Sequence, residues 1–188
     1  MTYRWNFADV FENWPALAIG LLGTVQLFVV CLICGLSLGL IVALGRRAQA
    51  APLRWASTAF VEFFRNTPVL VQILWLYFAL PILLPVEISP FTAAALGIAL
   101  NSTAYAAETY RGGIQSIEPG QWEAARALGM SYIQLLRRIV LPQAVRRMLP
   151  ALTNRGIEIC KMSTLASVVA YPELIQQGKL IASLNFNP

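Results

Sequence analysis

The sequence predicts an all-α protein, a polytopic bundle of membrane-spanning helices. Apolar residues make up 57% of the chain and charged residues only 12%, whereas about a quarter of the residues of a soluble domain are charged. The mean hydropathy is +0.62. The apolar residues gather in long segments, and a spanning helix needs about 20 residues. We therefore expect one transmembrane domain over residues 1–188, with spans over residues 16–44, 60–84, 90–107 and 149–171.

The first segment, residues 16–44, is longer than one bilayer thickness and ends just before Arg46 and Arg47. It contains Gly35 and Gly39, and small residues four apart let two helices pack closely. Glycine is also simply more common in membrane helices, so the pair has two interpretations. Polar and aromatic residues precede the segment in place of a cleavable signal peptide, and we expect the segment to stay in the membrane.

The other three segments carry proline or polar residues. The second, residues 60–84, contains Pro68 and Pro81, and a short loop around Glu87 leads to the third, residues 90–107. The fourth segment is interrupted by Asn154, Arg155, Glu158 and Lys161.

Most of the arginines lie in two of the connections between segments. Arg46, Arg47 and Arg54 follow the first segment, and Arg111, Arg126, Arg137, Arg138, Arg146 and Arg147 follow the third. Positively charged loops remain in the cytoplasm. We therefore expect the N-terminus with Asp9 and Glu12, the loop around Glu87 and the tail after Tyr171 to lie outside. This distribution accounts for the net charge of +5 without nucleic acid.

The larger cytoplasmic loop, residues 111–147, predicts two short helices. Pro119 suits a first helical position and Gly129 the position just past a helix end. Ser131 and Gln134 fit a capping box for the second helix, and Pro142 is expected to end it.

Three functions could explain the first loop helix, where Glu123 and Arg126 flank the shallow surface expected at Ala124 and Ala125. A DNA-binding helix-turn-helix is one, but a loop held at both ends by spans could hardly reach a major groove. An amphipathic pair on the lipid headgroups explains the second helix better than the first. The third function is docking of a cytoplasmic partner.

The stretch "EAARALGMSYIQLLRRIVLP" resembles the EAA loop of ABC importer permeases. That loop has E-A-A, three residues, G, nine residues, I, one residue and L-P. The matching residues are Glu123, Ala124, Ala125, Gly129, Ile139, Leu141 and Pro142. The stretches "VEFFRNTPVLVQILWLYF", "AYAAETYRGGIQSIEPGQWEAARALG" and "KMSTLASVVAYPEL" resemble the polar amino-acid uptake subfamily, of the histidine, glutamine and glutamate permease type.

The resemblance implies the core of a type I importer permease (MetI-like) in the bacterial inner membrane. Two permease subunits would form the path, two ATPase subunits would bind the paired loops, and an external binding protein would deliver the amino acid. The residues implied in coupling to the ATPase are Glu123, Ala124, Ala125, Leu128 and Gly129. The sequence lacks G-x-x-x-x-G-K-[ST], so we expect no ATP site in this chain. As a permease subunit it is also expected to have no cofactor, no metal and no catalytic role. Family members have a further span, so the chain is expected to be truncated.

Polar residues within the spans are candidates for the translocation path, because an ionisable group in lipid is costly and usually faces a partner or a wet cavity. Asn154, Glu158 and Lys161 share one helix face. They could line the path, or Glu158 and Lys161 could pair between helices. Thr67 and Asn101 could touch the substrate, or bond another helix.

Two further expectations concern charge. Glu62 and Arg65, three residues apart, are expected to form a structural ion pair. Met162 follows Lys161 where the family often has an acidic residue or Asn, which makes a cationic substrate less favourable.

Two other classes of protein compete with the permease. An intramembrane hydrolase could use Ser163 with Lys161, but the chain has no histidine, and the loop would stay unexplained. An ion-coupled secondary transporter of small polar solutes would also place polar residues in spans. It usually has more spans and internal repeats, which this sequence does not show.

Overall fold

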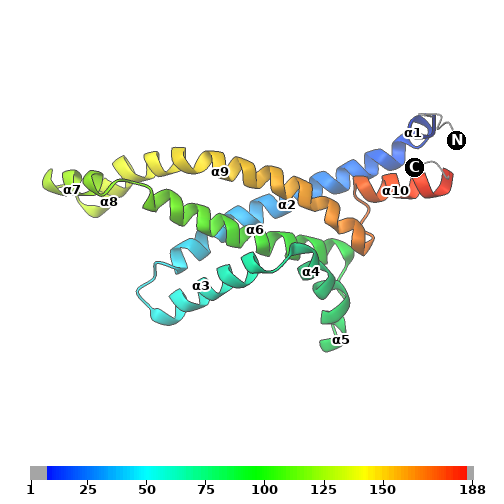
Figure 1. The fold of residues 1–188 in the computed structure, drawn as a ribbon, viewed down its shortest axis with the longest axis horizontal. Helices are drawn as coiled ribbons and strands as arrows, with labels where there is room; N and C mark the ends of the chain where they lie inside the picture. Colours follow the sequence, from blue (N-terminus) through cyan, green and yellow to red (C-terminus); the bar gives the residue numbers. More distant parts are fainter. Residues whose placement is uncertain (1–7, 186–188) are drawn as a thin grey trace. The chain divides into compact units, whose positions relative to one another are not determined.

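The computed structural model describes the backbone of residues 8–185, and in this range every regular element is helical (Figure 1). This confirms the prediction of an all-α protein. The side chain of Asp9 and the last residues of the tail, 186–188, lie outside the described residues, so the expectations for them are not addressed.

The chain forms two compact units, each assembled from separate stretches of sequence. The described residues of the first unit come from Met1–Cys31, Pro68–Ala99 and Ile159–Pro188, and those of the second from Leu32–Thr67 and Leu100–Glu158. Three long helices contribute residues to both units: α2 (Trp14–Gly45), α6 (Pro90–Gln115) and α9 (Leu141–Met162).

The first apolar segment is the single helix α2. Among the described residues, it alone is long and apolar enough by itself to cross a membrane. Many of its large apolar side chains are exposed, including Leu22, Ile33 and Ile41. Exposed aliphatic side chains of this kind suit a lipid environment.

The second apolar segment is broken by its own proline. α3 (Ala51–Asn66) ends at Thr67, which has an extended backbone with φ −107° and ψ 134°. Thr67 is extended because a proline disfavours the helical conformation of the residue before it. Pro68 itself is extended as well. The chain then continues as α4 (Val69–Leu74), a π-helical turn (Trp75–Ala79) and α5 (Leu80–Leu83). Together α3 and the α4–α5 stretch form one further candidate span.

The helix after the loop does not end at Pro142, contrary to our expectation. α8 (Tyr132–Leu135) continues through a π-helical turn (Leu136–Val140) into α9. At this turn the N–H of Leu141 donates to the carbonyl of Leu136, five residues earlier. A proline has no N–H and its ring crowds the preceding turn of an α-helix. The wider π-helical turn gives that ring room, so the helix passes through the proline.

Close packing in the second unit depends on Gly39. A Cβ atom at Gly39 would lie 2.6 Å from the Cβ of Ala106 and 3.1 Å from the carbonyl oxygen of Thr103. Only a residue without a side chain fits there, so α2 and α6 approach closely at this point. This supports the packing interpretation of the glycine pair.

The first unit contains the end of the described chain. A 3-10 helix (Ser163–Val169) follows α9, and α10 (Leu174–Asn185) comes last. The buried carboxylate of Glu173 accepts the backbone N–H groups of Ile175 at 2.8 Å and Gln176 at 2.6 Å. These bonds satisfy donors that the first turn of a helix leaves free.

Candidate functional site

The loop helix α7 (Pro119–Ala127) ends in a turn with fixed geometry. Gly129 has φ +71°, a conformation that favours glycine. Its N–H donates to the carbonyl of Arg126 at 2.9 Å, and the N–H of Met130 donates to the carbonyl of Ala125 at 3.1 Å. This pair of bonds is a Schellman motif. The prediction that Gly129 stands just past a helix end is confirmed.

The start of the next helix is fixed as well. The hydroxyl of Ser131 accepts the backbone N–H of Gln134 at 3.4 Å, and the side-chain oxygen of Gln134 accepts the N–H of Ser131 at 3.0 Å. The predicted capping box is therefore confirmed. Because both sides of the reversal are hydrogen-bonded, α7 and α8 are held by a defined turn.

The predicted coupling residues divide into an inward and an outward group. Ala125 is 1% exposed and packs in a small core, whose other buried members are Ile117, Leu135, Val140, Ala144 and Met148. Ala124 and Glu123 are exposed, and Leu128 is 79% exposed. The expectation that both alanines form a shallow exposed surface is therefore wrong for Ala125, which anchors the helix. Ala124 faces outward as expected.

Two exposed apolar residues of the loop were not among the predicted site residues. Tyr132 and Ile133, in the first turn of α8, are 59% and 73% exposed. Together with Leu128 they place exposed large apolar side chains on both sides of the turn between α7 and α8. Their position in the sequence could have identified them as exposed, because they directly follow the capping Ser131 and stand apart from the helical stripe formed by Leu135 and Val140.

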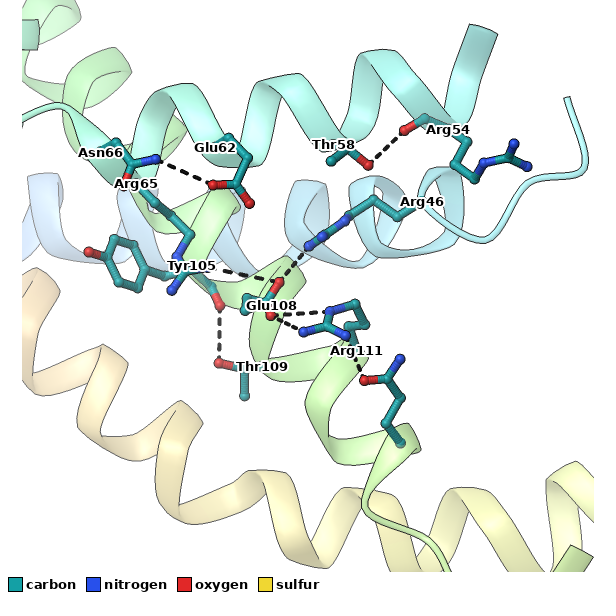
Figure 2. Close-up of polar contacts among 11 residues, drawn as sticks. Arg46, Arg54, Thr58, Glu62, Arg65, Asn66, Tyr105, Glu108, Thr109 and Arg111 are labelled. Carbon is teal, nitrogen blue, oxygen red and sulfur yellow. Dashed lines mark hydrogen bonds and ion pairs between the residues drawn. The ribbon is translucent and has the colours of Figure 1, made fainter. Parts of the chain in front are cut away.

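Glu108 joins several arginines at the end of α6, just past the predicted third span (Figure 2). One carboxylate oxygen lies 2.5 Å from Arg46, and the other accepts the Nε–H of Arg111 at 3.1 Å. Arg65 lies 3.9 Å from the same carboxylate. The hydrogen bonds from Arg111 and then Arg46 lower the pKa of Glu108 from 4.5 to about 2, against the opposing effect of burial.

The expected ion pair between Glu62 and Arg65 does not form. Arg65 is within ion-pair distance of Glu108 instead, and Glu62 accepts the side-chain amide of Asn66 at 3.3 Å (Figure 2). Glu108 was not among the residues predicted for the site. Its position among arginines, directly after an apolar segment, was the available signal.

A second polar cluster surrounds Arg155, which is 4% exposed in α9. Its guanidinium donates to the side-chain oxygen of Asn101 at 2.8 Å and to the hydroxyl of Ser102 at 3.0 Å. It also forms an ion pair with Glu158 at 2.9 Å. Glu158 therefore pairs with Arg155 and not with Lys161, the partner considered from the sequence. Arg155 was not among the predicted path residues.

The path candidates occupy different environments. Asn101 is buried, and its amide also donates to the carbonyl of Phe64 at 2.8 Å, which favours a role in joining helices. Thr67 ends α3 and donates to the carbonyl of Phe63 at 2.9 Å. Glu158 is exposed along α9, as are Asn154 and Lys161. Their assignment to the translocation path stays a prediction.

Comparison with known proteins identifies the family. The family model described as "Binding-protein-dependent transport system inner membrane component" matches residues 35–187. The probable amino-acid ABC transporter permease protein YckA of Bacillus subtilis is 40% identical over 185 residues, which cover 98% of this chain and 81% of the relative. The glutamine transport system permease protein GlnP of Escherichia coli is 40% identical over 177 residues, 92% of this chain and 81% of the relative.

Solved structures agree with these relatives. A chain of an amino acid ABC transporter crystallised with histidines is 35% identical, with a TM-score of 0.91 over 98% of this chain and 86% of that one. The MetNI methionine ABC transporter shares the fold, with a TM-score of 0.74 at 23% identity over 94% of this chain and 85% of that one. These likenesses confirm the type I importer permease (MetI-like) core and give no support to a secondary transporter. The chain belongs to the family of inner-membrane components of binding-protein-dependent transport systems.

Proposed function

We propose that this chain is the permease subunit of an ABC importer that carries polar amino acids across the bacterial inner membrane. A separate pair of ATPase subunits hydrolyses ATP, and this chain has no catalytic role. The observation that carries the proposal is the rigid turn after α7, which presents Glu123, Ala124 and Leu128 outward. The amino-acid permeases among the relatives supply the substrate class.

The packing of the loop explains how it transmits movement. Ala125 fixes α7 to the small core around Leu135 and Met148. The Schellman motif and the capping box connect α7 rigidly to α8, and α8 continues into α9. A displacement of α7 by the ATPase is therefore passed to α9 as a rigid-body movement rather than absorbed in a flexible loop.

The proposed assembly contains a second permease subunit, an external amino-acid-binding protein and surrounding lipid, with no nucleic acid. The chain spans the membrane several times with its N-terminus outside. We infer this orientation from the arginines in and next to the α2–α3 and α6–α9 connections, because positively charged loops remain in the cytoplasm.

Transport by the reconstituted system tests the proposal. The chain is co-purified with its ATPase, placed in vesicles with the binding protein, and given a panel of amino acids. Leu128→Asp should abolish ATP-driven uptake and weaken ATPase co-purification, because it places a charge on an exposed apolar contact. Leu128→Met, which keeps the contact apolar, is the matched control. Unchanged uptake by Leu128→Asp would remove the loop from the mechanism.

A further inference from the structure

A cavity of about 550 Å³ lies in the second unit, beside α7. Its walls come from the end of α2, the start of α3, the end of α6 and α7. Five arginines line it: Arg46, Arg47, Arg54, Arg111 and Arg126. Glu123 is the single carboxylate among the lining residues. The cavity therefore carries a strong excess of positive charge.

Two of these arginines share one carboxylate. Arg46 and Arg111 bind Glu108, and Arg111 also donates to the side-chain oxygen of Gln115 at 2.6 Å (Figure 2). Arg47, Arg54 and Arg126 are different. Within the described part of the chain, none of the three has a carboxylate within 4.0 Å, and all three are exposed. Three uncompensated guanidinium groups thus face one cavity.

Apolar side chains make up much of the rest of the lining. Ile114, Ile117, Pro119 and Trp122 line the cavity together with the polar residues Thr58 and Gln115. Tryptophan is enriched where a protein meets the membrane–water interface, because its ring is apolar and its N–H is polar. A ligand that suits both the arginines and the apolar side chains of this cavity carries a compact anion and an apolar portion.

We propose that this cavity binds the phosphate-bearing headgroup of an anionic phospholipid from the cytoplasmic leaflet. Guanidinium groups match phosphate in charge and in hydrogen-bond geometry. Arg47, Arg54 and Arg111 stand near the end of α2, the start of α3 and the end of α6, which is the headgroup layer in the proposed orientation. Arg126, on α7, lines the same cavity. The proposal rests on that membrane orientation and is independent of the transported amino acid.

A headgroup in this position connects two parts of the cytoplasmic face. Arg47 lies in the α2–α3 connection and Arg54 in the first turn of α3, next to that connection, whereas Arg126 belongs to α7. A phosphate shared between them holds α7 against that connection. The lipid therefore sets how freely the coupling helix moves, in addition to the contacts of Ala125.

Native mass spectrometry of the full chain, alone and bound to its ATPase, measures the site directly. The probes are phosphatidylglycerol, phosphatidylcholine and inorganic phosphate. We expect saturable binding of phosphatidylglycerol in preference to phosphatidylcholine, with no displacement by inorganic phosphate at the same concentration. In the triple variant Arg47→Gln, Arg54→Gln and Arg126→Gln, the affinity should fall about fivefold for each arginine removed.

Matched variants separate the site from general charge. Arg137→Gln, Arg138→Gln and Arg146→Gln remove the same charge from exposed loop arginines outside the cavity, and should leave binding unchanged. Replacing the three cavity arginines by lysine should retain most of the affinity, which excludes misfolding as the cause of the loss.

Several outcomes overturn the inference. If both triple Arg→Gln variants weaken lipid binding equally, the effect is one of general charge. If inorganic phosphate displaces the lipid, the cavity binds a soluble anion instead. Loss of bound lipid when the ATPase joins assigns the cavity to an acidic surface of that partner. Because lipid binding is measured without transport, none of these results bears on the proposed importer function.

Discussion

The guanidinium of Arg155 lies over the ring of Tyr105, with its central carbon 4.5 Å from the ring centroid. Arg65 also approaches this ring, at 5.2 Å. A cation over an aromatic face is attracted by the ring quadrupole, which is negative at the face. Tyr105 thus connects arginines from α3 and α9, and it supports the buried Arg155 together with Asn101.

Removing the ring of Tyr105 should destabilise the second unit. We expect Tyr105→Leu to lower the stability of the purified protein by about 1–2 kcal/mol, since the two cations lose the aromatic face. Tyr105→Phe keeps the face and serves as the control. Thermal unfolding in detergent gives the difference. Equal effects of Leu and Phe would show that the hydroxyl, and not the ring, is what matters.

Gly129→Ala should impair coupling without preventing membrane insertion. A side chain at φ +71° costs about 1 kcal/mol or more, which distorts the turn after α7. Gly120→Ala is the control, because Gly120 has open space around it as Gly129 does but has no positive φ. Uptake and ATPase co-purification are measured together. Wild-type uptake by Gly129→Asp combined with Glu123→Lys would exclude the loop as the coupling element.

The carboxylate of Glu108 should give the protein a defined acid sensitivity. Its pKa is lowered from 4.5 to about 2 in the folded protein. The ion pairs therefore stabilise the fold fully above pH 4.5, and this contribution is lost as the pH falls toward 2. Wild type should be more stable than Glu108→Gln at neutral pH, and the difference should shrink across that window. A difference that stays constant with pH would assign the effect to packing.

The orientation of the chain can be tested with an impermeant thiol reagent on intact cells. Cys31, Cys34 and Cys160 are first replaced by serine. We expect Glu12→Cys to react from outside, and Arg137→Cys to react only after the cells are opened. Labelling of Arg137→Cys in intact cells would reverse the proposed topology.

Lys161 should disfavour cationic amino acids. It is exposed, and Glu158, which could have neutralised it, pairs with Arg155 instead. Within the described residues, no carboxylate lies within 4.0 Å of Lys161. On the proposed assignment of Lys161 to the translocation path, its charge attracts a carboxylate and repels arginine or lysine. The reconstituted importer should therefore prefer neutral or acidic amino acids, and Lys161→Met should reduce that preference. Preferred uptake of arginine by wild type would contradict this assignment.

Local features of this fold could be predicted from the sequence, and long-range pairings could not. The turn at Gly129 and the capping box at Ser131 depend on residues a few positions apart. Arg65, in contrast, was expected to pair with Glu62 on its own helix, whereas it lies 3.9 Å from Glu108 on another. Spacing along one helix shows which residues share a face, but it does not show which helix covers that face.

The π-helical turn before Pro142 has a geometric consequence for everything beyond it. A turn closed by a bond over five residues contains one residue more than an α-helical turn, and one residue corresponds to about 100° of rotation and 1.5 Å of rise. This surplus residue sets the phase of α9 relative to the capping box. Without it, the face of α9 that carries Arg155 would point about 100° away from Asn101 and Ser102. The proline in the EAA loop thus fixes, through the turn it requires, which side chains of the following helix reach the interior.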